Sequence, residues 1–593
     1  MDQRKAEALR IAIVGLMVAY FLAISWRKWP DPIVDFGQQC YSVWRVSQGA
    51  ALYHDFNWSY GPLSIFFNAA LFRCFGRGIM VLATANLVVY GFILSLAYLA
   101  FRMAWGWLAA FAASAVFISV FSFSHLGGVG NYNYATPYSA ESVHGMLLIL
   151  ITAFVTVRWC EGPSLKLAFL LGLCGGLAVV MKPEFMLAIG VLGFAACVLR
   201  WWQRQRIGIA EFCMMGVGAL LPTLAFTAWF ARVESWKAAF VDASQAWWLV
   251  LVTQVQRESG QQQNFTGLDH AGTNALLEMK SAFWALVAMA AIWAAGWCAN
   301  RSWSPLMRVI TALAAGMLVC FVRLQGGWME VGRCLPGLAA LALVLVTVRV
   351  WREVRSNGRA GQGSVMALML ALLAAAMLAR MPLFARIYHL GFFQAALAAM
   401  VVVALMVTEL PRWTGTGIWG RRVSILGCVL VIATGCFSIA EVSRKIRADQ
   451  TEPVGWDRDR FYSTTRNVDG TGAIINWAAQ LFRAVPKEAV VLVLPEGSMV
   501  NYLSQHKSVE QYTSRNGEKD FIAHLQKTPP DFVVLITRDM TDVGIARWGA
   551  PANFGSEVMG WVTTNYSLVA KFGGDPLALD DHPGAKVWLR NQK

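Results

Sequence analysis

Charged side chains are scarce in this chain, at 14% of its 593 residues. A soluble protein of this length carries about 25%. The hydrophobic share is 57%, and apolar runs near the length that crosses a bilayer recur along the chain. These proportions exclude a disordered protein and a soluble enzyme as descriptions of the whole chain. They indicate a polytopic α-helical membrane protein.

The cysteines do not indicate a disulfide framework. The 11 cysteines are odd in number, most lie in or beside apolar runs, and none follows Cys436. This pattern differs from the paired cysteines of a secreted disulfide scaffold. No His/Cys spacing typical of a zinc site occurs, and the chain has no internal repeat.

About thirteen transmembrane helices are predicted from the apolar runs. The first run follows Arg4, Lys5 and Arg10 and lacks a small-residue cleavage site, so we expect a retained helix rather than a removed signal peptide. The predicted spans cover residues 11–26, 79–101, 104–122, 139–157, 165–181, 184–200, 208–231, 281–298, 309–324, 335–350, 364–380, 391–408 and 424–441.

Acidic residues are outnumbered by basic ones, 35 to 50, and the basic residues gather in loops at one end of these spans. We therefore expect them to orient the chain among membrane lipids rather than to bind nucleic acid. The positive-inside rule places the N-terminus in the cytoplasm, and an odd number of spans places the C-terminal part outside. We expect a multi-pass membrane protein whose C-terminal domain lies outside the cytoplasm.

Two domains are predicted, a membrane domain over residues 1–441 and a soluble one over 442–593. The membrane domain has long outer loops at 27–78 and 232–280. In the soluble part, strand-like runs at 490–494, 532–537 and 566–572 alternate with helical stretches near 519–527 and 554–565. Alternating strands and helices predict a small α/β domain.

Ionisable residues collect in the first outer loop. Asp35 lies between short apolar stretches, so we expect partial burial, which would suit a carboxylate to act as a general base. Asp55 and Tyr60 are further candidates for contacts with a donor or an acceptor. The alternative for Asp35 is a cap on a helix that begins at Gly37.

Glu141 and His144 lie three residues apart at the mouth of the fourth span and would share one face of a helix. Both are candidates for the same donor or acceptor site. A divalent metal could be held by Asp35, Glu141 and His144, whose side chains are suitable ligands, but their spacing across separate loops does not by itself indicate a metal site. The alternatives are a favourable position for Glu141 at a helix N-terminus and an interfacial role for His144.

Several cations fall in predicted outer turns. Lys182, in Lys182-Pro183-Glu184, is suited to bind a lipid phosphate, as are Arg323 and Arg333 around another turn. Arg380 and Arg386 flank a third turn. The alternative for each cation is a side chain that reaches from the membrane edge to water.

Short motifs follow one another in the first two hundred residues: Asp35-Phe36-Gly37, Gly49 to Tyr53-His54-Asp55-Phe56, Tyr60-Gly61-Pro62-Leu63, Phe75-Gly76, Pro137-Tyr138-Ser139-Ala140-Glu141 and Lys182-Pro183-Glu184. They resemble GT-C glycosyltransferases, polytopic enzymes that take a sugar from a polyprenyl-phosphate carrier. Protein O-mannosyltransferases and the aminoarabinose transferase of lipid A are such enzymes. Many relatives carry two adjacent acids where this chain has Asp35 and Phe36.

The resemblance implies an inverting transfer on the outer side of the membrane. Asp35 matches the first-loop acid that activates the acceptor, which would be a lipid, a glycan or a protein. A secondary transporter is the main alternative, but it predicts inverted repeats and charges at mid-helix. A ligase or polymerase of lipid-linked glycans is the second alternative, and it would rely on arginines in a late loop.

Overall fold

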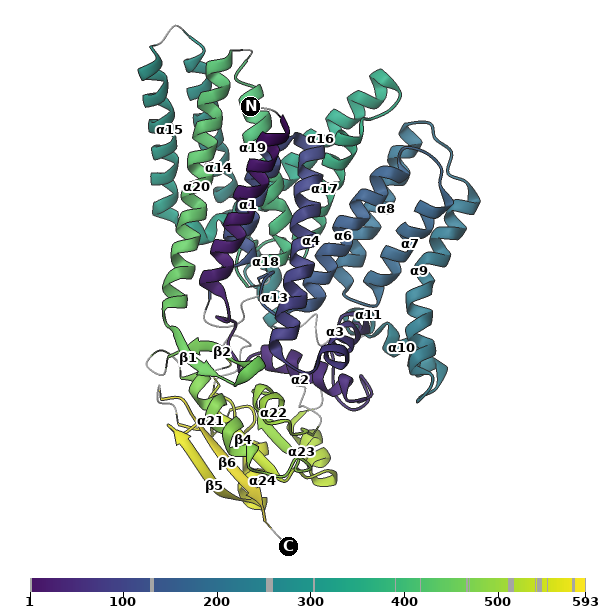
Figure 1. Cartoon of the computed structure of the whole chain (residues 1–593), viewed down its shortest axis with the longest axis vertical. Helices are drawn as coiled ribbons and strands as arrows, with labels where there is room; N and C mark the ends of the chain where they lie inside the picture. Colours follow the sequence, from purple (N-terminus) through teal and green to yellow (C-terminus); the bar gives the residue numbers. More distant parts are fainter. Residues whose placement is uncertain are drawn as a thin grey trace.

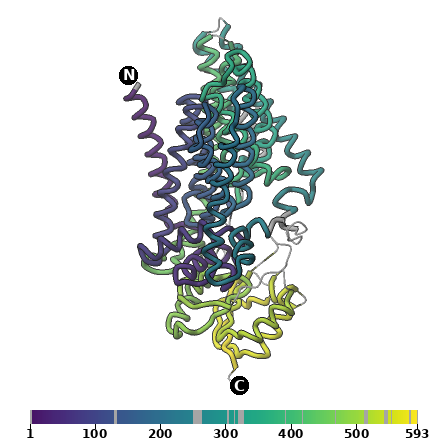
Figure 2. Tube along the Cα trace, turned by 90° about the vertical axis from the view of Figure 1, so that its right-hand side faces the viewer, coloured from purple at the N-terminus to yellow at the C-terminus, as the bar shows by residue number. Residues whose placement is uncertain are grey.

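A computed structural model describes residues 3–127, 133–251, 260–301, 304–389, 391–415, 417–465, 468, 470–509, 517–538, 540, 547–551, 553–578 and 582–591. Long helices run up and down between two ends of a bundle, and a small domain containing strands lies beyond one end (Figure 1). The N-terminus lies at the opposite end of the bundle from this domain (Figures 1 and 2).

Nine helical segments of the described chain are long and apolar enough to cross a membrane, which confirms the polytopic class. Helix α1 stands at the edge of the bundle (Figure 2), and only 6% of its apolar stretch is buried against the rest of the protein. The nine segments contain α1 (Gln3–Ser25), α4 (Ile79–Trp105), α6 (Ala140–Trp159), α8 (Pro183–Trp202), α9 (Ile209–Phe230), α14 (Ala271–Ala299), α16 (Leu335–Asn357), α19 (Ala396–Arg412) and α20 (Ile418–Ala448).

The other four predicted spans correspond to helices whose apolar stretch is shorter. Helix α17 is enclosed by its neighbours, with Met369, Leu370 and Leu373 fully buried, so its apolar sequence reflects packing on all sides. The four are α5 (Trp107–Val116) with the π-helix η1 (Phe117–Ser122), α7 (Leu165–Val179), α15 (Pro305–Gly326) and α17 (Gln362–Leu378).

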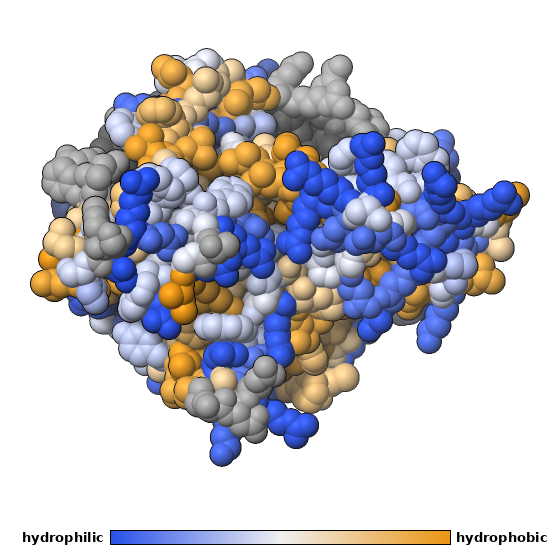
Figure 3. Space-filling model, turned by 90° about the horizontal axis from the view of Figure 1, so that it is seen from above, coloured by the Kyte–Doolittle hydropathy of each residue, from blue (hydrophilic) through white to orange (hydrophobic). Residues whose placement is uncertain are grey.

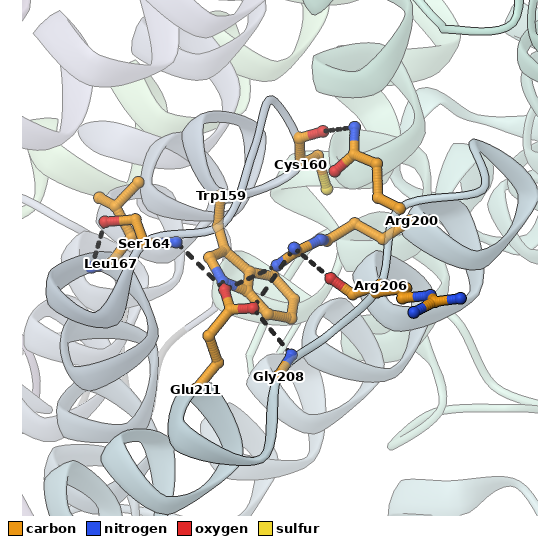
Figure 4. A network of polar contacts seen from close by, with 9 residues as sticks. Trp159, Cys160, Ser164, Leu167, Arg200, Arg206, Gly208 and Glu211 are labelled. Atoms are coloured by element: carbon orange, nitrogen blue, oxygen red, sulfur yellow. Dashed lines mark hydrogen bonds and ion pairs between the residues drawn. The ribbon is translucent and has the colours of Figure 1, made fainter.

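Hydrophilic side chains gather over the end of the bundle that carries the N-terminus (Figure 3). One arginine expected in a solvated loop there is instead fully buried. Arg200 donates to the carboxylate of Glu211 over 2.8 Å, and its guanidinium lies 4.5 Å from the ring of Trp159. The same carboxylate accepts hydrogen bonds from Trp159 Nε1 and from the backbone N–H groups of Ser164 and Gly208 (Figure 4). The cluster therefore joins the ends of α6, α8 and α9.

The C-terminal domain contains a four-stranded sheet in the order β3-β4-β6-β5, in which β3 and β4 are parallel and the other pairs are antiparallel. The expected strands appear as β3 (Val491–Leu494), β4 (Phe532–Ile536) and β5 (Tyr566–Gly573), and the expected helices as α23 (Gly517–Lys527) and α24 (Ser556–Asn565). The sequence did not reveal β6 (Gly584–Arg590), the hairpin β1 (Gln450–Val454) and β2 (Phe461–Thr464), or α21 (Thr471–Arg483).

Candidate functional site

Asp35 stands in a strained turn at the start of α2 (Phe36–Ser47). Its φ and ψ are 54° and −43°, and the N–H of Phe36 donates to the carbonyl of Val34 across it. This is a γ-turn with positive φ, which is rare for any residue that carries a Cβ. Strain of this kind clusters at functional sites because only the surrounding structure holds it in place.

The carboxylate of Asp35 faces outward. Its side chain does not cap α2, and its Oδ2 accepts a hydrogen bond from the hydroxyl of Tyr138 over 2.8 Å. The expected partial burial is wrong, because Asp35 is exposed while Phe36 takes the buried position. The Phe36 ring packs edge-on against Tyr138 and Phe461. The carboxylate is thus accessible to a substrate and oriented by a neighbouring phenol.

Tyr60-Gly61-Pro62-Leu63 and the turn before Lys182 lie side by side. Gly61 N–H donates to the carbonyl of Met181 over 2.9 Å, and Leu63 N–H donates to that of Val180 over 3.0 Å. A Cβ at Gly61 would overlap the Val180 carbonyl, so only glycine fits. Two motifs that are far apart in the sequence therefore pack backbone against backbone.

Lys182 is buried and ion-paired rather than extended to water. Its ammonium lies 3.2 Å from Glu184 Oε1, 2.9 Å from Ser142 Oγ and 5.0 Å from the centroid of the Tyr60 ring. Glu184 also accepts from Arg380 over 2.6 Å. Burial lowers the pKa of Lys182, and the charge of Glu184 opposes that shift. We name Lys182, Glu184 and Arg380 the ion-pair triad.

Tyr60 lies near several charged side chains of the candidate site. Burial raises the pKa of the Tyr60 hydroxyl well above its usual range, and the charges of Asp35 and Glu141 act in the same direction. Glu141 is buried and accepts from Gln39 Nε2 over 2.9 Å, while Gln39 Oε1 accepts from the N–H of Ser139. Gln39 therefore ties α2 to the start of α6, a role that the sequence did not reveal.

The remaining candidates of the first loop and α6 have local partners. His144 Nδ1 lies 3.0 Å from Ser64 Oγ in α3 (Pro62–Phe75). Asp55 accepts from the N–H of Ala51 over 2.9 Å and pairs with His54 at the surface. Among the residues that the structure describes, no three His, Cys, Asp or Glu side chains gather closely enough to hold a metal ion. Asp35, Glu141 and His144 thus do not form the ligand set that the sequence left open.

Of the two arginines proposed around the later turn, only one has a described side chain. Arg333, in the 3-10 helix η2 (Trp328–Cys334), donates to Glu330 over 2.7 Å and lies 4.6 Å from the ring centroid of Phe384. Arg386 lies over the same ring at 4.5 Å and is buried. The side chain of Arg323 is outside the described residues.

The C-terminal domain supports the loop that carries Asp35 (Figure 1). A Cβ added to Gly37 would lie 2.8 Å from Met499 Cα, at the start of α22 (Met499–Ser504). Ser498 Oγ donates to Gln38 over 2.8 Å, and Arg77 pairs with Asp459 over 3.2 Å. The first two contacts hold α2 against the C-terminal domain, and the Arg77–Asp459 pair joins that domain to the turn between α3 (Pro62–Phe75) and α4.

No protein-family model matches the chain, and no curated protein matches it. Among solved structures, the chain is similar to ArnT from Cupriavidus metallidurans bound to undecaprenyl phosphate, at 11% identity and a TM-score of 0.43 over 99% of this chain and 98% of that one. It is also similar to the archaeal oligosaccharyltransferase AglB from Archaeoglobus fulgidus in complex with an inhibitory peptide and a dolichol-phosphate. That match has 8% identity and a TM-score of 0.45 over 90% of this chain and 70% of that one. Both belong to the GT-C superfamily, but at these identities and scores the similarities assign no activity to this chain.

Proposed function

We propose that this protein is a membrane glycosyltransferase that moves a sugar from a polyprenyl-phosphate carrier to an acceptor hydroxyl or amine. The observation that carries the proposal is the exposed, Tyr138-bonded carboxylate of Asp35 in its strained turn. Its charge acts on Tyr60, whose ring centroid lies 5.0 Å from the ammonium of Lys182, and the helix that follows Asp35 packs against the C-terminal domain. We place this end of the bundle on the outer side of a bacterial inner membrane.

We infer the following course for the transfer, which the position of the Asp35 carboxylate supports. Asp35 takes the proton of the acceptor as the acceptor oxygen or nitrogen attacks the anomeric carbon. The new bond forms on the face opposite the phosphate, the bond between that carbon and the phosphate oxygen breaks, and the configuration inverts. The electron pair leaves with the polyprenyl phosphate, whose charge a nearby cation stabilises.

The side chains around Asp35 have distinct proposed roles. Tyr138 orients the carboxylate, while Tyr60 and Glu141 line the place where donor or acceptor would enter. Lys182 contributes a positive field from within the ion-pair triad, because its ammonium is already bound to Glu184 and Ser142. Arg333 is left as a candidate for direct contact with the lipid phosphate, together with Arg323.

A gene deletion tests the proposed function for any sugar and any acceptor. Envelope lipids, glycans and glycoproteins of the deletion strain are compared by mass spectrometry with those of strains that carry the wild-type or the Asp35→Asn gene. We expect one species in the deletion strain to lose the mass of one sugar. The wild-type gene should restore that sugar, and the Asp35→Asn gene should not. Asp520→Asn, an exposed change in α23, is the matched control and is expected to restore it too. An unchanged envelope in the deletion strain would contradict the proposal.

A further inference from the structure

A polar pocket opens in the C-terminal domain, at the end of the sheet where β3 and β4 begin. Its volume is about 870 Å³, and sites for small molecules measure roughly 300–1,000 Å³. The last turns of α23 and α24, the start of β5 and the end of β6 line it. The proposed sugar transfer uses none of these segments.

The pocket lies at the end of the sheet that is away from the candidate site. Val490, directly before β3, donates to Oδ2 of Asp531 over 2.9 Å at the pocket end. At the other end of β3 the chain turns into α22, whose Met499 lies against Gly37 of α2. Strand β6 runs away from the bundle and ends at the pocket (Figure 1). The pocket is therefore separate from Asp35.

Trp561 supplies a flat apolar surface in the pocket. Its ring is partly buried against the core of the domain and lies 5.5 Å from the ring of Tyr566, at an interplanar angle of 58°. The Tyr566 hydroxyl donates to the carbonyl of Pro530 over 2.9 Å, which holds the second ring in place. Aromatic rings fixed in this way offer a large contact area to a ligand at a small cost in conformational entropy.

The polar side chains of the pocket present donors and acceptors in fixed directions. Asn591 Oδ1 accepts from Ser567 Oγ over 2.6 Å, so the Asn591 Nδ2 group is available as a donor. Asn565 Nδ2 donates to the carbonyl of Trp561 over 2.8 Å, so the Asn565 Oδ1 atom is available as an acceptor. The backbone bond to one oxygen of Asp531 orients its other oxygen. Because each hydroxyl group both donates and accepts, a ligand with several hydroxyl groups matches this pattern.

The charges around the pocket balance. Among the described residues that line it, Asp531 is the one acid and Arg590 the one base. The N–H of Arg590 donates to the carbonyl of Asp531 over 3.0 Å, so the two residues are neighbours. A pocket whose lining has no net charge does not attract a phosphate or a polyanion, and it suits a neutral ligand.

We propose that this pocket binds a saccharide, one ring of which stacks on Trp561. The apolar C–H face of the sugar covers the indole, and its hydroxyl groups bond to Asn565, Asn591 and Asp531. The inference goes beyond the proposed function, because binding in this pocket requires no sugar transfer. It gives the C-terminal domain a second role beside its contact with α2, which is to hold a glycan.

Saturation-transfer NMR with the purified full-length protein tests the inference. The protein is placed in phosphatidylcholine nanodiscs, since maltoside detergents carry a sugar that would compete. The probes are maltotriose, α-mannotriose, cellotriose and chitotriose, and the control ligands are sorbitol and trialanine. We expect at least one trisaccharide to bind, whereas sorbitol has hydroxyl groups without a ring face and trialanine is a peptide. Neither control ligand should bind.

Two variants locate the binding in the pocket. Trp561→Ala should weaken it by at least about tenfold, because truncation of a central aromatic side chain removes the stacking surface. Asn591→Ala should weaken it by about threefold through the loss of one hydrogen bond. Trp201→Ala is the matched control, because Trp201 is 74% exposed at the other end of the bundle, and it should bind as the wild type does.

Thermal unfolding of each variant shows whether it is folded. The inference is overturned if no trisaccharide binds, if sorbitol or trialanine binds equally well, or if folded Trp561→Ala binds as the wild type does. If Trp561→Ala does not fold, unchanged binding by Asn591→Ala overturns it instead. Asp35→Asn should retain saccharide binding, so this result stands or falls separately from the proposed transfer.

Discussion

The hydroxyl of Tyr138 donates a hydrogen bond to Oδ2 of Asp35 over 2.8 Å. The bond joins the start of α6 to the start of α2, two segments about a hundred residues apart in the chain. Because Asp35 occupies a strained γ-turn, a partner from another helix helps to hold its carboxylate in one direction. The direction in which the proposed base points depends on this pair.

Tyr138→Phe removes the bond and keeps the ring. We expect sugar transfer to slow by about tenfold or more, since a hydrogen bond to a charged group contributes ~1.5–3 kcal/mol. The rate is measured with purified enzyme at saturating donor. Tyr134→Phe is the control, because the buried Tyr134 hydroxyl has no hydrogen-bond partner among the described residues. Equal slowing in both variants would contradict a specific role for Tyr138.

Glu184→Gln leaves Lys182 and Arg380 without their shared carboxylate. Breaking a buried ion pair by removing one partner costs about 3–5 kcal/mol, so we expect a clear fall in Tm in detergent micelles. Glu161→Gln breaks an exposed pair with Arg158 and should leave Tm nearly unchanged. Equal Tm values for the two variants would show that the ion-pair triad does not stabilise the fold.

Gly37→Ala places a Cβ against the backbone of Met499. We expect α22 to separate from α2, which should increase proteolysis of the C-terminal domain and slow sugar transfer by misplacing Asp35. Gly190→Ala is the matched control, since a Cβ there meets nothing within 4 Å. Normal protease resistance and normal activity in Gly37→Ala would contradict the supporting role of the C-terminal domain.

The ionisation of Asp242 is expected to make the stability of the folded protein depend on pH. Burial and the neighbouring charge of Glu234 raise its pKa to about 6 in α10 (Trp236–Ala243), from an ordinary value of 3.8. The folded state therefore binds this proton more tightly than the unfolded state, and its stabilising effect is lost as pH rises from about 4 to about 6. Asp242→Asn should raise Tm at pH 7 and flatten its pH dependence across that window. A Tm profile identical to that of the wild type would contradict the shift.

Local patterns in the sequence predicted much of this fold. The apolar runs at α4 and α9 and the strand at β3 are visible because each is long or uniformly apolar. Strand β6 and the β1–β2 hairpin are less visible, because their residues mix charge and apolar groups and become strands only through pairing. Helix α17 is apolar throughout for packing within the bundle, so its sequence alone does not distinguish an enclosed helix from a lipid-facing one.

The sequence supplies candidate residues for the site but not their arrangement. Residue type and position make Asp35, Tyr60, Glu141 and Lys182 candidates, whereas their partners in the fold come from segments far apart in the chain. The burial of Lys182 depends on Glu184 and Arg380, and no local pattern encodes that packing.

The most direct test of the central claim is the rate of sugar transfer by purified Asp35→Asn, measured beside its binding of undecaprenyl phosphate. A general base contributes about 10²–10⁴-fold to a rate, so we expect transfer to fall by at least about a hundredfold while lipid binding and Tm stay as in the wild type. Transfer by Asp35→Asn at close to the wild-type rate would contradict the account.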